Sequence, residues 1–454
     1  MLKEENATLE PVASIVPHRP SSNAPIPSPL SFLLFIYLIT LYIRPQDWVS
    51  FMLGWPVDYI VFALLLGGSI FQLEAWQRIF SLPLFYLLLV WLAIIVLSNL
   101  AQGGDGAWYA RLAFIEYGKS ILISMCLFLF LNSTGQMRRL IWFQIFLSGV
   151  LAYQCMDQVA NGVGWAGQPL GWDDGLGGRA QWVGMWDGMG VLALLFVVAF
   201  PFLIQFMFPP WNPVIRIISL LFSILIFQGL VLTQSRGGML ASGVALFASL
   251  ILRFKPRTAL IMGAIVVILG APFLGFLTSR GFDDSDGSKS ASHRVELWAA
   301  GLDMAKEHPV FGVGKTRFRH NAREKTGLAL IAHNSYVENL GETGIPGLFV
   351  YVALAYLSIK GLWHVSKNVS DPKDRSLALA LLASICSYAG SSMFVTTDFI
   401  LFYLQLGFAA AFCSLNGYHP MLTWKDVFWI VLLEIGFVLF LQLFTVLFMS
   451  GAFS

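Results

Sequence analysis

The sequence predicts an all-α polytopic membrane protein, with about 12–13 transmembrane helices and one large, partly helical periplasmic loop. Hydrophobic residues make up 57% of the 454 residues and charged residues only 12%, whereas a soluble domain carries about 25% charged residues. Long apolar runs recur along the chain, and the basic residues between them are distributed asymmetrically. No basic cluster with interleaved aromatic residues appears, so we expect no nucleic-acid partner.

Thirteen apolar runs approach the roughly 20 residues that cross ~30 Å of hydrocarbon as a helix. Backbone polar groups in hydrocarbon have to be satisfied within the segment, so each run is predicted to be helical. The first run is short, and the two runs beside Asp398 are almost continuous. The sequence therefore predicts a range for the number of spans and not a single number. The runs are 29–43, 57–73, 81–99, 112–131, 140–157, 188–208, 213–233, 237–253, 258–278, 345–363, 376–396, 398–416 and 426–449.

This pattern divides the chain into four regions. Residues 1–28 are polar, rich in Pro and Ser, and lack the apolar core of a signal peptide, so we expect a disordered cytoplasmic tail. Residues 29–278 are predicted to form the first nine helices and residues 345–454 the last helices. Between them, residues 279–344 form the one long polar connection, and a connection of that length is usually functional.

The orientation is predicted from Lys and Arg in the short loops, which concentrate on the cytoplasmic side of a membrane. With the N-terminus in the cytoplasm, twelve such residues lie on the inner side and four on the outer side, and residues 279–344 face the periplasm. The inner residues are Arg78, Arg138, Arg139, Arg216, Arg253, Lys255, Arg257, Lys360, Lys367, Lys373, Arg375 and Lys425, and the outer ones are Arg44, Arg111, Arg179 and Arg236.

Three polar stretches lie at the predicted outer boundary. The turn Thr233–Gly238 places an Arg between two spans, and its paired glycines would let a ligand approach the backbone, although a snorkelling Arg in a tight turn also explains it. Ser292–Trp298 begins a stretch with helical spacing of apolar residues, which a surface helix ending near Pro309 also explains. His333–Gly347 places a His, an Asn and two Glu beside a span, although a lone His is more often structural.

The segment Phe311–Thr316 contains a Gly-x-Gly-Lys-Thr pattern that is typical of a phosphate-binding loop. Pro309 stands where the first Gly of that motif belongs, and the loop is predicted to face a compartment without ATP. A nucleotide site is therefore rejected, and Lys315 is assigned no role.

Together, the three stretches resemble the O-antigen ligase and polymerase superfamily. The family pattern has an Arg a few residues before a Trp, then an apolar run with a Pro and two Gly, then a His-Asn-x-Tyr to Glu-Thr-Gly signature that enters a helix. The resemblance covers about residues 210–365. Three motifs occur in the family's order around one long loop, which argues against a chance match. The matching segments are Thr233–Gly238, Arg294–Trp298, Pro309–Gly314, His333–Gly347 and, more loosely, Tyr42–Asp47.

The resemblance implies a glycosyltransferase that takes a glycan from a polyprenyl-diphosphate carrier to a hydroxyl acceptor at the periplasmic face of the bacterial inner membrane. Arg236 and Arg294 match the family's diphosphate-binding arginines, and the planar guanidinium group suits bidentate hydrogen bonds to phosphate. His333 matches the catalytic His, which would accept the proton of the acceptor hydroxyl. Direct attack would invert the anomeric centre.

The resemblance also gives secondary roles to other residues. Four residues of the third stretch are expected to orient the loop, the His or the sugar, and three further outer arginines are possible contacts to donor or acceptor. Because two arginines would neutralise the leaving diphosphate, no metal and no cofactor are expected. The four supporting residues are Asn334, Tyr336, Glu338 and Glu342, and the three arginines are Arg44, Arg111 and Arg179.

Several functions remain open within this chemistry. A ligase would transfer a finished glycan to the lipid A core, a polymerase would join repeat units on the carrier, and a protein O-glycosylation ligase would use a protein hydroxyl. We prefer the ligase, because the pairing of the Arg-to-Trp element with the His signature resembles ligases. A transporter of lipid-linked glycans is the alternative outside this class. It predicts matched halves and charges deep within the spans, and only Glu116, Lys119 and Glu434 lie away from the ends of the runs.

Overall fold

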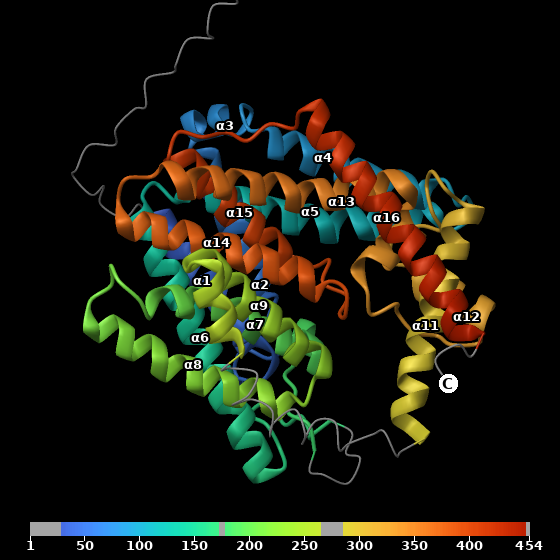
Figure 1. The fold of residues 1–454 in the computed structure, drawn as a ribbon, viewed down its shortest axis with the longest axis horizontal. Coiled ribbons are helices and arrows are strands. Elements are labelled where there is room, and N and C mark those ends of the chain that lie inside the picture. Colours follow the sequence, from blue (N-terminus) through green and yellow to red (C-terminus); the bar gives the residue numbers. More distant parts are fainter. Residues whose placement is uncertain (1–28, 172–177, 265–284, 451–454) are drawn as a thin grey trace, which may run out of the picture.

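The computed structural model describes residues 29–171, 178–264 and 285–450, and these residues form a bundle of α-helices (Figure 1). In the described residues, β-structure is limited to the isolated bridges Val163–Pro169 and Gly171–Arg179. The predicted all-α class is therefore confirmed. The predicted tail at residues 1–28 lies outside the described residues.

Outside the predicted loop, the helices follow the predicted apolar runs, with an additional short helix, α3, between the second and third runs. The helices α11 and α12 lie within the predicted polar loop. They are α1 (Pro29–Tyr42), α2 (Val57–Ile70), α3 (Leu73–Ile79), α4 (Pro83–Leu100), α5 (Gly106–Phe130), α6 (Thr134–Asn161), α7 (Met189–Phe206), α8 (Pro213–Thr233), α9 (Arg236–Arg253), α11 (Ser285–Glu307), α12 (Phe318–Thr326), α13 (Ser335–Asn368), α14 (Pro372–Ser391), α15 (Ile400–Leu415) and α16 (Trp424–Met449), with 3-10 turns η1 (Pro45–Asp47) and η2 (Gly184–Trp186).

Among the described residues, eight helices are long and apolar enough to cross a membrane, namely α4, α5, α6, α7, α8, α9, α13 and α16. Three shorter apolar helices, α1, α2 and α15, accompany them. Of the predicted span 258–278, residues 258–264 are helical and the rest lies outside the described residues. A polytopic membrane protein is thus confirmed, while the number of 12–13 spans stays a prediction.

Local capping explains the sharp turn between α8 and α9. Gln234 ends α8 in the left-handed conformation, with φ 51°, and the Ser235 side chain accepts a hydrogen bond from the amide of Gly238 (3.1 Å) as the N-cap of α9. One helix therefore ends and the next begins within two residues, and Arg236 occupies the first turn of α9.

The helix α13 is kinked at Gly344, where φ is 70° and ψ is −171°. Pro346 has no N–H, so one carbonyl of the preceding turn has no helical donor. The amide of Ile345 donates to the carbonyl of Pro309 (2.9 Å), which frees a second carbonyl. The helix begins at Ser335, earlier than the predicted start of a span at residue 345, because hydropathy detects only its apolar half.

The helix ends gather at two ends of the bundle. The end where α9 and α13 begin is here called the motif end. There, Arg317 pairs at 2.9 Å with Asp105, the residue directly before α5 in the sequence. At the opposite end, where α9 and α13 terminate, Arg138 of α6 pairs with Asp374 of α14 at 3.1 Å. Which of the two ends faces the cytoplasm stays a prediction.

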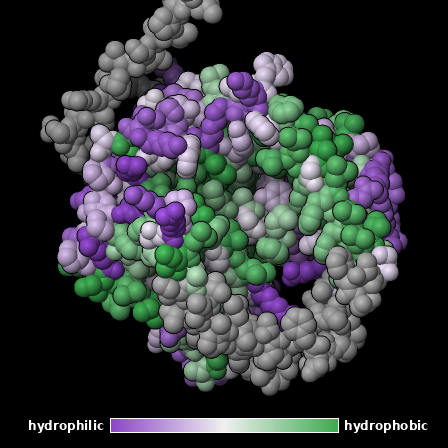
Figure 2. All heavy atoms as spheres, in the orientation of Figure 1, coloured by the Kyte–Doolittle hydropathy of each residue, from purple (hydrophilic) through white to green (hydrophobic). Residues whose placement is uncertain are grey.

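The outer helices expose apolar side chains, as expected for contact with lipid. On α16, Trp424, Phe428, Leu433 and Leu443 are each at least 60% exposed. Figure 2 shows hydrophobic residues over much of one face, and a hollow between the side formed by α11 and α16 and the rest of the bundle, with hydrophilic residues at its edge.

Candidate functional site

His333 lies in the turn that leads into α13. Its backbone is in the left-handed region, with φ 50°, and its side chain is half-buried. Asn334, which is fully buried, caps α13 by accepting hydrogen bonds from the amides of Tyr336 (3.0 Å) and Val337 (3.2 Å). The cap fixes the position of the backbone that carries the imidazole.

Arg294 reaches the same turn from α11. The indole nitrogen of Trp298 donates to the carbonyl of Ala332, directly before His333, at 3.0 Å. Arg294 and Trp298 are four residues apart in one helix, so their side chains lie on the same face. The spacing of Arg and Trp in the sequence therefore places the guanidinium group on the side of α11 that faces His333.

Arg236 is connected to the His333 turn through the segment between α14 and α15. Gly237 packs closely against Val395, such that a Cβ on Gly237 would lie 3.5 Å from a methyl group of that residue. The Ser335 hydroxyl donates to the carbonyl of Val395 (3.2 Å) and accepts from the amide of Thr397 (2.7 Å). One short segment thus contacts both the beginning of α9 and the beginning of α13.

The positive charge of Arg294 acts on His333, and that of Arg236 acts on Arg294. Burial lowers the pKa of His333, and the positive charges of Arg294 and Arg319 lower it further, to about 4. Burial also lowers the pKa of Arg294, as does the positive charge of Arg236. The site therefore holds a neutral imidazole next to guanidinium groups that repel one another.

The remaining residues of the third stretch make contacts within the protein. The Tyr336 hydroxyl donates to the carbonyl of Ala389 at 2.8 Å, and Glu338 accepts a hydrogen bond from the Thr396 hydroxyl at 2.6 Å. Glu342 accepts from the amide of Phe318 at 3.0 Å. These contacts tie the first half of α13 to α12, α14 and the α14–α15 segment, so they fit the expected role of orienting the loop.

Lys315 is the centre of a buried ion cluster. Its ammonium group lies 2.8 Å from Asp398 and 3.1 Å from Glu342, and it donates to the side-chain oxygen of Asn339 at 2.6 Å. Burial alone would lower the pKa of Lys315, but the carboxylates of Asp398, Glu342 and Glu338 outweigh it and raise that pKa. The cluster joins the chain before α12, the first half of α13 and the start of α15.

Backbone contacts hold the segment of Lys315 against the kink of α13. The amides of residues 313–314 donate to the carbonyls of Gly341 and Glu342, which the kink leaves without helical donors (2.9 and 3.0 Å). Gly312 has φ 62°, and a Cβ there would lie 2.5 Å from the amide nitrogen of Thr343. The Gly-x-Gly pattern therefore serves close packing of two backbone segments.

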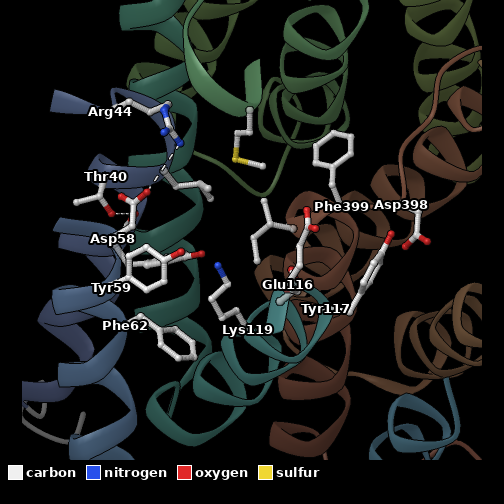
Figure 3. Close-up of a pocket in the computed structure, with 15 residues that line it drawn as sticks. Thr40, Arg44, Asp58, Tyr59, Phe62, Glu116, Tyr117, Lys119, Asp398 and Phe399 are labelled. Carbon is white, nitrogen blue, oxygen red and sulfur yellow. Dashed lines mark hydrogen bonds and ion pairs between the residues drawn. The ribbon is translucent and has the colours of Figure 1, made fainter. Parts of the chain in front are cut away.

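A cavity of about 220 Å³ lies among α1, α2, α5 and the start of α15 (Figure 3). Arg44 lines it and pairs with Asp47 at 2.5 Å, and lies 3.9 Å from Asp58. Glu116 and Lys119 of α5 also line it, and Lys119 lies 4.8 Å from the ring centre of Tyr59. Charges at membrane depth usually face such a cavity.

The other two outer arginines take different positions. Arg111 is exposed on the first turns of α5 and does not line this cavity. Arg179 forms a backbone bridge to Gly171 and contacts the sulfur of Met189 at 3.5 Å. Of the three further arginines, Arg44 is thus the one placed at the cavity.

Residues 220–352 match the family model described as O-Antigen ligase. The sequence of this region is therefore similar to that of the O-antigen ligase family. The matched region includes Arg236, Arg294 and His333 and ends within α13, so the resemblance seen in the sequence is confirmed. No curated protein matches the chain. The match supports O-antigen ligase-type glycosyl transfer in general.

Sequence reasoning missed two basic residues of the O-antigen ligase region. Lys315 received no role when the nucleotide-binding motif was rejected. Its carboxylate partners, Glu342 and Asp398, lie far from it in the sequence. Arg319, in the first turn of α12, acts on His333 although it belongs to none of the recognised motifs. The position of Lys315 in a Gly-rich run was a sequence signal, whereas no sequence signal pointed to Arg319.

Proposed function

We propose that the chain transfers a glycan from a polyprenyl-diphosphate carrier to a hydroxyl acceptor at the motif end, without a metal ion. The supporting observation is electrostatic, because the charge of Arg236 acts on Arg294 and the charge of Arg294 acts on His333. Two cations beside a neutral base are the groups that departure of a diphosphate and deprotonation of a hydroxyl require.

In this proposal, Arg236 and Arg294 hold the diphosphate of the donor. The two guanidinium groups repel each other in the free protein, and an anion between them removes that repulsion. As the bond between the anomeric carbon and the diphosphate oxygen breaks, negative charge develops on the leaving group. Bidentate hydrogen bonds from the arginines would stabilise this charge more strongly in the transition state than in the bound donor.

His333 would act as the general base. With a pKa of about 4 the imidazole is neutral at pH 7, so a ring nitrogen can accept the proton of the acceptor hydroxyl. The hydroxyl oxygen attacks the anomeric carbon from the side opposite the diphosphate, which inverts that centre. The bound diphosphate would offset the field of Arg294 and raise the pKa of His333, so the base becomes stronger when the donor is present.

The acceptor preferred here is the lipid A core, with transfer at the periplasmic face of the inner membrane. Polymerisation of repeat units or glycosylation of a protein would use the same donor chemistry with another acceptor. Among the outer arginines, Arg44 is the best candidate for a further substrate contact, because it lines the cavity among α1, α2 and α5.

Deletion of the gene, followed by analysis of the surface polysaccharide, distinguishes the lipid A ligase from the polymerase. A ligase predicts that long chains disappear from lipid A while carrier-linked chains remain, and a polymerase predicts single repeat units. Complementation with His333→Asn should leave the deletion phenotype unchanged. Normal polysaccharide in the deletion strain would contradict both assignments.

A further inference from the structure

A second pocket, of about 500 Å³, lies at the opposite end of the bundle from His333. It is formed by the ends of α9 and α13, the start of α14 and the chain before α8. Three of its lining residues are basic and none is Asp or Glu. The lining residues are Pro209, Pro210, Leu252, Arg253, Trp363, Ser366, Lys367, Pro372, Arg375 and Leu379.

Two of the three basic groups contact neutral partners. Arg253 donates a hydrogen bond to the carbonyl of Pro209, and Lys367 lies 4.1 Å from the ring centre of Trp363. The positive charge of Arg375 acts unfavourably on Arg253. None of these contacts supplies a negative charge, so the pocket has an uncompensated positive potential.

The nearest carboxylates are engaged elsewhere. Asp374, which precedes Arg375, pairs with Arg138 at 3.1 Å, and Asp371 accepts a hydrogen bond from the amide of Lys373 as the N-cap of α14. In the part of the chain that the structure describes, the basic residues of the pocket have no carboxylate partner. An anion from outside the chain would therefore relieve the repulsion.

The position and the apolar walls of the pocket favour one kind of anion. α9 and α13 are both candidate membrane spans, and the pocket lies where they end, which is the level of lipid headgroups. Leu252, Leu379 and the half-exposed Trp363 supply apolar surface beside the cations, and Trp is typical of the membrane interface. A molecule with both a phosphate and an apolar part fits such a pocket.

We propose that this pocket binds the phosphate group of an anionic phospholipid at the face of the membrane opposite the transfer site. The phosphate would bridge Arg253 and Arg375, with Lys367 beside it, and the glycerol and acyl chains would lie against the apolar wall. The bound lipid ties together the ends of α9 and α13, the helices whose other ends begin next to Arg236 and His333. This inference does not depend on the transfer reaction.

The test uses the purified full chain and measures phosphatidylglycerol binding by native mass spectrometry, with phosphatidylcholine of the same acyl chains for comparison. Arg253→Gln combined with Arg375→Gln removes two charges of the pocket. Lys255→Gln combined with Arg257→Gln is the matched control, because these exposed residues follow α9 but do not line the pocket. Arg253→Lys with Arg375→Lys keeps the charges and reports whether the site tolerates substitution.

The parent chain, the control and the Lys variant should retain phosphatidylglycerol in preference to phosphatidylcholine. The Gln variant should bind phosphatidylglycerol about tenfold more weakly or worse, because two basic contacts are lost. Equal binding by the Gln variant, or an equal loss in the control, overturns the proposal. If inorganic phosphate alone displaces the lipid and stabilises the protein against heat equally well, the site takes soluble phosphate and the lipid assignment fails.

Discussion

The ammonium group of Lys315 lies 3.1 Å from the carboxylate of Glu342, and both side chains are almost completely buried. Removing one partner of a buried ion pair leaves the other charge without compensation, which costs roughly 3–5 kcal/mol. Lys315→Met should therefore lower the thermal unfolding temperature markedly.

The control for this change is Lys325→Met. Lys325 pairs with Glu307 at 2.6 Å, but the carboxylate is more than half exposed, and surface pairs are worth about 0–1 kcal/mol. Thermal unfolding of the detergent-solubilised protein should separate the two variants clearly. Similar unfolding temperatures for both would show that the Lys315 cluster does not stabilise the fold.

His333→Asn should abolish most of the transfer activity without unfolding the protein. Asn tolerates the left-handed backbone found at this position, so the turn is retained while the base is lost. Loss of a general base slows a reaction by roughly 10²–10⁴-fold. Transfer is measured in membranes supplied with carrier-linked donor, with His320→Asn on α12 as the control. Activity near that of the parent would exclude His333 from the mechanism.

Replacing Arg236 or Arg294 by Lys should also reduce transfer, even though the charge is kept. A Lys ammonium group cannot make the two parallel hydrogen bonds that a guanidinium group makes to phosphate. We expect a loss of about tenfold or more, from the greater strength of bidentate charge-assisted bonds. Arg323→Lys, on α12, is the matched control, and equal rates for all three variants would remove the arginines from donor binding.

The pH dependence should differ between the free protein and the donor complex. Catalysis needs neutral His333, so the rate falls as the pH decreases through the pKa of that group. In the free protein the pKa is about 4, which places the acid limb of kcat/KM near pH 4. The acid limb of kcat should lie at higher pH, because the bound diphosphate offsets the charge of Arg294.

Arg294→Gln provides a check on the same mechanism. It removes one of the charges that lower the pKa of His333, so the acid limb of kcat/KM should move to higher pH while the maximal rate decreases. A limb that stays at the same pH in this variant would show that Arg294 does not act on the base.

Gly312→Ala should destabilise the protein more than Gly327→Ala. Both glycines have positive φ, 62° and 77°, but a Cβ on Gly312 would meet the backbone of α13 while one on Gly327 would meet nothing within 4 Å. The left-handed conformation alone costs a non-Gly residue about 1–2 kcal/mol. Thermal unfolding of the two variants therefore isolates the steric contribution, and equal effects would contradict the close backbone contact.

Most helix boundaries could be predicted, because the apolar runs end at the residues that cap the helices. α8 occupies the predicted range, 213–233, since Asn212 caps its start and Gln234 ends it in a left-handed turn. The first half of α13 was missed for the opposite reason. Residues 335–344 are polar yet mostly buried against other helices, and hydropathy reports composition rather than contact.

The family motifs pointed to His333, Arg236 and Arg294. The four-residue spacing of Arg294 and Trp298 on α11 explains why Arg294 faces the His333 turn. Lys315 and Arg319 could not be found in this way. Their effects depend on groups that only the folded chain brings near, such as Asp398 for Lys315.

The amides of residues 313–314 replace the helical donors that the kink of α13 removes. The chain between Pro309 and Lys315 is therefore fixed in length, because an added or deleted residue would leave two buried carbonyls without hydrogen bonds and shift Lys315 out of its cluster. The stretch from Gly327 to Leu330 has no such constraint. Natural insertions in the loop, and engineered tags, should accumulate there and be absent from residues 309–315.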